Sequence, residues 1–310
     1  MDPLNVLTKT YGYLRNYGMP KWVMTPPRKA IRRLANWYLP KCLSKPCVIK
    51  SSRAENVIVS FTSFPARIAD VWKVVESLKR QNVQPEKIIL WLSELQFPDH
   101  NSIPDSLWER EDELFEIRMV KEDIRSHKKF YYVMQEFPDK AFVTCDDDIY
   151  YDPDMIKRLL KTSSIFPGCI IANISVRMQF DEQGTILPYL QWDRQPEPYS
   201  KDDCFQVGVG GVLYPPNTLH KLTLRKDLFM SLTPMADDIW LNCMARLNGT
   251  CVVQSEKRLL PLSIENNSPS LSSVNKGENR NDLQLLKLRE YLIKNDLSDV
   301  YSANYLKKHQ

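Results

Sequence analysis

The sequence predicts an α/β fold with a mostly parallel central sheet flanked by helices. Four short apolar runs have the length and composition of buried strands: residues 57–62, 87–92, 115–120 and 141–145. Segments with helical spacing separate them, such as residues 68–80, where apolar residues recur every three or four positions, and residues 128–137. Strands that alternate with helices are typical of a parallel sheet covered on both faces.

The second half of the chain is less regular. Strands are expected at residues 169–174 and 251–253, and helices from Asp237 to Asn248 and over residues 283–293. Residues 205–214 form an apolar run with three glycines, which predicts either a bulged strand or a close approach of backbone to a ligand. Neither GxGxxG nor GxxxxGK[ST] occurs, which excludes the usual dinucleotide and P-loop sites.

Composition places the chain among soluble globular proteins, with 43% hydrophobic and 26% charged residues in 310. No apolar stretch reaches the roughly 18 residues needed to span a bilayer, and the N-terminus lacks the apolar core of a secretory signal. The seven cysteines are scattered, odd in number and without a CxxC, so neither a disulfide framework nor a zinc ribbon is expected. A reducing, cytoplasmic setting is the default expectation.

Residues 1–55 are expected to form a basic, aromatic extension ahead of a folded domain at residues 56–310. Residues 1–56 contain eleven Lys and Arg against two acidic residues, while the whole chain carries a net charge of only +4. Residues 27–39 predict a short basic helix with Trp37 and Tyr38 near its end. Such a helix suits an anionic membrane surface, and packing on its own domain is the alternative. Nucleic acid is the weakest partner, because no nucleic-acid motif accompanies the charge.

Asp146, Asp147 and Asp148 directly follow the strand expected at residues 141–145. Side chains alternate along an extended segment, so Asp146 and Asp148 should point one way and Asp147 the other. Paired carboxylates favour Mg²⁺ or Mn²⁺, which fill their other positions with phosphate and water. A polar turn is the alternative, whereas a calcium loop is excluded by its missing Gly and Glu. Asp152, followed by Pro153, is expected to cap the next helix.

Five stretches occur in the order found in one enzyme family. They are Ser63-Phe64-Pro65-Ala66-Arg67, Ser126-His127-Lys128-Lys129, the Asp triplet, Gly208-Val209-Gly210-Gly211 and Ala236-Asp237-Asp238-Ile239-Trp240. Over residues 56–285 the chain resembles GT-A fold nucleotide-sugar glycosyltransferases of bacterial surface polysaccharide synthesis, which build O-antigen or capsule. The first stretch is similar to that of galactofuranosyltransferases.

The resemblance implies a metal-dependent inverting transfer of galactofuranose or another hexose from a UDP-sugar to a lipid-linked glycan acceptor. Asp146 and Asp148 would then hold Mn²⁺ or Mg²⁺ against the donor diphosphate, and Asp147 would meet sugar or ribose hydroxyls. Arg67 and Lys128 would contact the phosphates or the nucleotide. The protein would act at the inner face of the cytoplasmic membrane, with residues 1–55 as its membrane contact.

The resemblance also implies that the catalytic base belongs to the Asp237-Asp238 pair. Asp238, with Asp237 as the second choice, would take the proton of the acceptor hydroxyl. The structural alternative is that Asp237 caps the helix and Asp238 only favours its dipole. Gly210 and Gly211 would let the donor or acceptor approach the backbone, and Trp192 and Trp240 are candidates for stacking on a sugar.

The chain departs from the family pattern at the third metal ligand. Many members of this fold use a histidine late in the chain for this ligand. The only late histidine here is His309, so Asn279, Asn281, Asp282 or water would have to substitute. Two other functions stay open: a Mg²⁺-dependent phosphoryl or nucleotidyl transferase, which also needs clustered carboxylates, and a non-catalytic sugar-binding protein of the same fold.

Overall fold

The structure is a computed structural model, and it describes residues 2–14, 20–46, 51–194, 196–201, 203–265, 280–303 and 305. Within these ranges the predicted α/β fold with a mostly parallel sheet is confirmed. Asn279 and His309, which the sequence analysis considered as metal ligands, lie outside the described residues.

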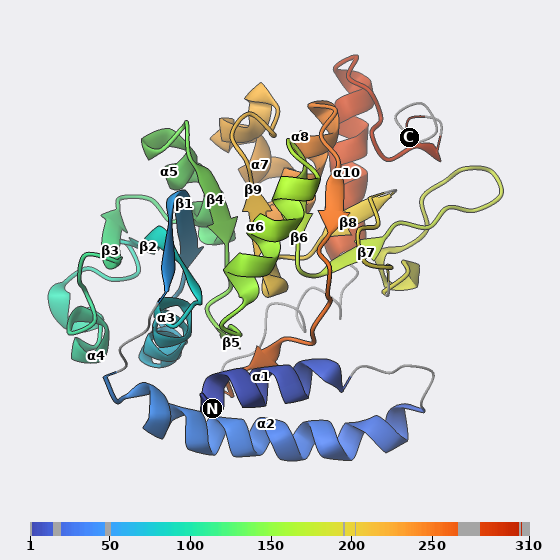
Figure 1. Ribbon diagram of the computed structural model, residues 1–310. Helices are drawn as coiled ribbons and strands as arrows, with labels where there is room; N and C mark the ends of the chain where they lie inside the picture. The colour runs from blue at the N-terminus through green and yellow to red at the C-terminus, as the bar shows by residue number, and fades with distance from the viewer. Residues whose placement is uncertain are drawn as a thin grey trace.

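A seven-stranded sheet forms the centre of the molecule, in the order β10-β6-β9-β4-β1-β2-β3 (Figure 1). Its strands are β1 (Ser52–Thr62), β2 (Val83–Ser93), β3 (Phe115–Val120), β4 (Ala141–Thr144), β6 (Ile170–Ala172), β9 (Val212–Tyr214) and β10 (Val252–Gln254). All neighbours pair in parallel except β9, which runs antiparallel to both β4 and β6. The carboxyl ends of β1 and β4 therefore lie side by side at one edge of the sheet.

Helices cover both faces of this sheet. They are α1 (Pro3–Tyr13), α2 (Lys21–Leu43), α3 (Val71–Lys79), α4 (Asp105–Trp108), α5 (Lys128–Glu136), α6 (Met155–Ile165), α7 (Lys226–Leu232), α8 (Asp237–Leu247) and α10 (Arg280–Lys294). Short 3-10 turns lie at Ile68–Asp70, His100–Ser102, Arg125–His127, Tyr189–Gln191, Gly208–Gly210 and Lys221–Leu224.

Alternation along β1 shows how the two layers are built. Val57 and Val59 enter the core beneath α3 and α6, whereas Ile58 enters the core beneath α5 and α8. Residues 88–92 of β2 divide between the same two cores in the same way. A strand with helices on both sides is apolar at consecutive positions, which is why these runs were recognisable in the sequence.

The glycine-containing run at residues 205–214 is not one bulged strand. It contains β8 (Cys204–Gln206), a 3-10 turn at Gly208–Gly210, and then β9. Gly211 has φ of +86°, a left-handed conformation that glycine adopts without strain. The turn therefore lets the chain leave one small sheet and enter the central one.

Two small antiparallel sheets complete the fold. One pairs β7 (Ser175–Arg177) with β8, and the other pairs β5 (Ile149–Tyr150) with β11 (Leu262–Ser263). Because β5 follows the Asp triplet directly, the second pairing fixes where the triplet lies. The backbone N–H of Ile264 also donates to the carbonyl of Asp148 at 2.8 Å.

The N-terminal extension forms two helices that pack on the domain. Asp2 caps α1 by accepting from the N–H of Leu4, and α2 extends well beyond the short helix that the sequence predicts. One stripe of α2 enters the same core as β1, through Ala35, Leu39 and Leu43. The two helices lie side by side along one edge of the molecule, close to β5 (Figure 1). Of the helices that the structure describes, none has the length and apolar character needed to cross a bilayer.

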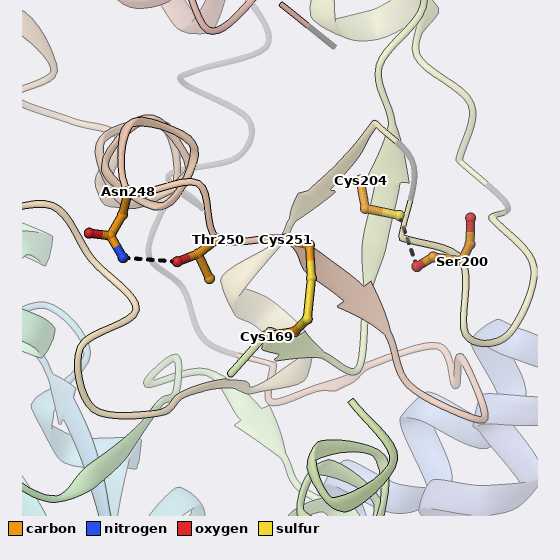
Figure 2. Close-up of a disulfide and its surroundings, with 6 residues drawn as sticks. All are labelled: Cys169, Ser200, Cys204, Asn248, Thr250 and Cys251. Atoms are coloured by element: carbon orange, nitrogen blue, oxygen red, sulfur yellow. Dashed lines mark hydrogen bonds between the residues drawn. A yellow bond between two sulfur atoms is a disulfide. The ribbon is translucent and has the colours of Figure 1, made fainter. Parts of the chain in front are cut away.

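A disulfide joins Cys169 to Cys251, with 5.1 Å between their Cα atoms (Figure 2). The sequence analysis expected no disulfide. The two cysteines are 82 residues apart, and they become neighbours because β6 and β10 pair in parallel with Ile170 opposite Val252. The spacing of the cysteines in the sequence does not reveal this pairing of β6 with β10.

We expect Leu39→Ala to lower the free energy of unfolding by about 2–5 kcal/mol, because it leaves a cavity in the core beneath α2. Leu34→Ala on the same helix is the matched control, since Leu34 is 48% exposed and should cost less than about 0.5 kcal/mol. Urea denaturation of the two variants measures both values. Equal losses would show that α2 does not pack in the core.

We expect reduction of the disulfide to destabilise the protein by up to about 4.5 kcal/mol, because the bond closes a loop of 82 residues. Denaturant midpoints with and without reductant measure this difference. The double variant Cys169→Ser with Cys251→Ser should be insensitive to reductant. An unchanged midpoint in the wild type would argue that the bond is absent.

Candidate active site

The candidate site lies where β1 and β4 end in the central sheet. Asp146, Asp147 and Asp148 follow β4, and Arg67 follows β1. The first turns of α5 and α8 bring Lys129 and Asp237 to the same place. Carboxyl ends of strands in open α/β sheets are the usual position of ligand sites.

Arg67 and Asp147 form the buried base of the site. Arg67 Nη1 lies 2.7 Å from Asp147 Oδ1 and 3.0 Å from Asp148 Oδ2, and the residue is only 4% exposed. The hydroxyl of Ser63 donates to the other oxygen of Asp147 at 2.6 Å. Burial acts to lower the pKa of Arg67, but Asp147 and Asp148 outweigh it and raise that pKa above its ordinary value.

Lys129 joins the two acidic elements of the site. Its ammonium group forms an ion pair with Asp146 and lies 3.7 Å from Asp237 Oδ2, at the start of α8. Burial acts to lower the pKa of Lys129, but Asp146 and Asp237 raise it well above its ordinary value. The ammonium group is therefore a permanent positive charge at the centre of the cluster.

The outer carboxylate of the triplet, Asp148, is less well neutralised. Burial and the nearby charge of Asp146 raise its pKa to about 6, although Arg67 opposes the shift. The side chains of Asp146 and Asp148 are 27% and 22% exposed, while that of Asp147 is 8% exposed. Asp147 is therefore the most buried of the three, although residues 147–148 form a turn and the same Arg67 nitrogen contacts both Asp147 and Asp148.

Asp238 lies in the first turn of α8 and faces the glycine turn before β9. The backbone N–H of Gly208 donates to its Oδ2 at 3.0 Å. Burial and the adjacent charge of Asp237 raise the pKa of Asp238 to about 8. The N-cap of α8 is Ala236, so neither aspartate is the helix cap that the sequence analysis weighed as an alternative.

Within the described residues, five carboxylates and two cationic groups make up the cluster, so negative charge is in excess. The carboxylates belong to Asp146, Asp147, Asp148, Asp237 and Asp238, and the cations to Arg67 and Lys129. An additional cation would be stabilised here, because it would relieve repulsion among acids of low solvent access.

The donor set suits a hard divalent cation that also binds phosphate. Across the part of the chain that the structure describes, no group of three or more His, Cys, Asp or Glu side chains is arranged to hold a metal ion. Mg²⁺, however, typically takes one or two protein carboxylates together with phosphate and water. Asp146 and Asp148 would supply these two carboxylates, and both are more exposed than Asp147.

Two predicted nucleotide contacts are placed differently from expectation. Lys128 is buried and its ammonium group lies 2.5 Å from Asp123 Oδ1, so it does not reach the triplet. Asp147 is held by Ser63 and Arg67, and its side chain is 8% exposed. The nucleotide contacts expected of Lys128 and Asp147 remain predictions.

The predicted glycine and tryptophan contacts also have structural explanations. A β-carbon on Gly210 would lie 2.6 Å from Ile174, and one on Gly211 would lie 2.9 Å from Met155, so both glycines allow close packing. Trp192 and Trp240 are buried in the core beneath α8 and are not available for stacking on a sugar. A ligand contact through the backbone of the two glycines remains a prediction.

The third metal ligand, for which Asn281 and Asp282 are the candidates within the described residues, remains a prediction. Asp282 accepts a hydrogen bond from the N–H of Tyr189 at 2.7 Å, at the start of α10. Asn279 and His309 lie outside the described residues.

Four residues at or near the site lie in the stretches that the sequence analysis singled out, but it gave them no role of their own. Lys129, Ser63 and Gly208 contact the acids directly, and the ring of His127 stacks on Phe229. Burial lowers the pKa of His127 to about 4, so its ring stays neutral beside Thr233. The adjacent lysines at positions 128 and 129 were the available signal, but the pattern does not tell which of them faces the acids.

We expect Asp148 and Asp238 to make stability fall as the pH rises from about 4 to about 8, whereas His127, whose pKa is lowered to about 4, has the opposite effect below about pH 6.5. The folded-state pKa values of Asp148 and Asp238 are raised above the unfolded value, so the folded state binds more protons in this window and loses stability as they dissociate. Asp238→Asn, which mimics the protonated acid, should flatten the slope between pH 6 and 8. Urea midpoints across this range measure it.

Asp139→Asn is the control for this experiment, because Asp139 is exposed and precedes the opposite end of β4. It should leave the slope as in the wild type. An identical slope in Asp238→Asn would contradict the assigned environment of Asp238.

No protein-family model matches the chain, and no curated protein sequence matches it. Solved structures with a similar arrangement include HddC from Yersinia pseudotuberculosis, at 13% identity over 52% of this chain and 77% of HddC, with a TM-score of 0.33. CMP:2-keto-3-deoxy-manno-octonic acid synthetase in complex with CTP matches at 11% identity over 66% of this chain and 89% of its own, with a TM-score of 0.39. UDP-glucose pyrophosphorylase in complex with UDP-glucose matches at 10% identity over 68% of this chain and 92% of its own, with a TM-score of 0.36.

These comparisons correct the predicted function. The sequence analysis predicted a UDP-sugar-dependent inverting glycosyltransferase with a lipid-linked acceptor, whereas the similar structures are a synthetase with CTP and a pyrophosphorylase with UDP-glucose. The glycosyltransferase prediction is therefore wrong. The α/β fold is established by the sheet topology itself. At TM-scores of 0.33 to 0.39 the likeness assigns no residue role and no substrate to this chain.

Proposed function

We propose that the site binds the phosphates of a nucleotide through Mg²⁺ or Mn²⁺ and catalyses nucleotidyl or phosphoryl transfer. The observation that carries this proposal is the convergence of two separate acidic elements on Lys129. Asp146 comes from the end of β4 and Asp237 from the start of α8, and both lie against the same ammonium group.

Convergent acids are what transfer at phosphorus requires. Divalent cations bound by clustered carboxylates neutralise the charge of the attacking and leaving oxygens. A site for a neutral ligand such as a sugar has no such need, and an excess of buried negative charge would be costly without a cation to offset it. Even with Asp238 protonated near neutral pH, four carboxylates in the described site outnumber the two cationic groups, which supports a ligand that arrives with metal.

Each side chain has a role in this proposal. Asp146 and Asp148 would hold the divalent cation, which would supply charge neutralisation at the phosphates. Arg67 keeps Asp147 and Asp148 in position from beneath, and Lys129 lies where it can meet a phosphate oxygen once Asp146 binds the cation.

Asp238 is the proposed general base. When the acceptor is a hydroxyl, its oxygen attacks phosphorus as its proton passes to Asp238. A phosphate acceptor is already ionised and attacks without a base. In both cases a phosphorus–oxygen bond of the nucleotide breaks. Pyrophosphate leaves in nucleotidyl transfer, and a nucleoside diphosphate leaves in phosphoryl transfer. A carboxylate whose pKa is raised to about 8 is a stronger base than an ordinary aspartate, which suits proton abstraction near neutral pH.

We expect the protein to consume a nucleoside triphosphate in the presence of Mg²⁺ or Mn²⁺ and a hexose 1-phosphate acceptor. A panel of ATP, GTP, CTP and UTP, read by mass spectrometry and by release of pyrophosphate or nucleoside diphosphate, identifies the reaction. Asp146→Asn and Asp148→Asn should each lower the rate at least about 100-fold, because charge neutralisation by the metal contributes several kcal/mol to the transition state.

Asp139→Asn serves as the matched control and should keep the wild-type rate. Chelation of divalent cations should abolish turnover, and adding back Mn²⁺ should restore it. Two outcomes contradict the proposal: no turnover with any triphosphate, or transfer of the sugar from a nucleotide sugar with release of nucleoside diphosphate.

A further inference from the structure

We propose that the outer face of α2 docks on an anionic membrane surface. This docking face consists of basic and large apolar side chains that all point away from the core: Trp22, Lys29, Arg33, Leu34, Trp37 and Lys41. The proposal is independent of the chemistry at the Asp cluster, and measurements of lipid binding alone test it.

The charge of α2 has one sign. The helix carries six Lys and Arg residues and no acidic residue over its 23 positions. Of these, Lys29, Arg33 and Lys41 are exposed on the docking face, whereas Arg28 and Arg32 are turned to Leu14 and Glu265. Cationic side chains close to an anionic bilayer each contribute about a factor of five in affinity.

The aromatic side chains are placed for the interface between water and lipid. Trp22 is 77% exposed and Trp37 is 62% exposed, and the ammonium group of Lys41 lies 4.1 Å from the centre of the Trp37 ring. Single exposed apolar residues are common on proteins, but two tryptophans and a leucine in line with cations form the pattern of an interfacial helix. The opposite stripe of the helix is already buried against the domain, so these residues have no role in the core.

The helix is held rigidly enough to orient the molecule. Asn36 donates to the carbonyl of Ser263 at 3.1 Å and accepts from the N–H of Glu265 at 2.8 Å. The residue between them, Ile264, donates to the carbonyl of Asp148. Figure 1 shows α1 and α2 on the side of the molecule where β5 leaves the triplet. Docking through α2 would therefore hold the Asp cluster at a fixed position relative to the bilayer.

Vesicle flotation of the full-length protein tests the proposal. We expect binding to vesicles of phosphatidylcholine with about one third phosphatidylglycerol, and none to phosphatidylcholine alone. Binding should be lost near 1 M salt, where the Debye length falls to about 3 Å. The triple variant Lys29→Glu, Arg33→Glu, Lys41→Glu should weaken affinity at least about 100-fold, and Trp22→Ala with Trp37→Ala should also weaken it.

Matched controls separate the docking face from overall charge and hydrophobicity. Lys157→Glu, Lys201→Glu and Lys221→Glu change the net charge equally at exposed sites elsewhere, and Leu95→Ala with Ile165→Ala remove exposed apolar side chains elsewhere. Both controls should bind as the wild type does, and thermal denaturation should confirm that all variants are folded. Equal loss in the charge controls, or binding to double-stranded DNA without binding to vesicles, would overturn the proposal.

Discussion

The buried ion pair between Arg67 and Asp147 is the constraint on which the site depends. It sets the end of β1 against the end of β4, and the hydroxyl of Ser63 completes the hydrogen bonding of the same carboxylate. Removing one partner of such a pair leaves an uncompensated buried charge and costs roughly 3–5 kcal/mol. Asp147 is the most buried member of the triplet, and the side chains of Asp146 and Asp148 are more exposed to solvent.

Lys129 has the complementary position on the other side of the cluster. It links the triplet after β4 to the acidic turn that opens α8, although these segments are about 90 residues apart in the chain. Repulsion among the acids would otherwise push α8 away from the sheet. One ammonium group thus allows two acidic elements to share a site, and it also leaves them with enough negative charge to attract a divalent ion.

The sequence predicted much of the central sheet because β1, β2 and β4 contribute apolar residues to both faces and are separated by amphipathic helices. The Asp triplet and the Asp pair were also recognisable, because clustered carboxylates are uncommon where they have no function. What could not be predicted was the partner of each charge. Lys128 and Lys129 are adjacent in sequence, yet one meets Asp123 and the other Asp146, because successive positions of a helix point in different directions. The disulfide and the β5–β11 pair depend on register between distant strands, which has no local signature.

The hydrogen bond from Ile264 to the carbonyl of Asp148 can form only late in the synthesis of the chain. During synthesis the acidic loop leaves the ribosome long before the segment that secures it, with more than a hundred residues still to be translated. The nascent chain therefore passes through a period in which its acids are present but not yet held together. A chain that ends before Ile264 would lack this hydrogen bond to the triplet.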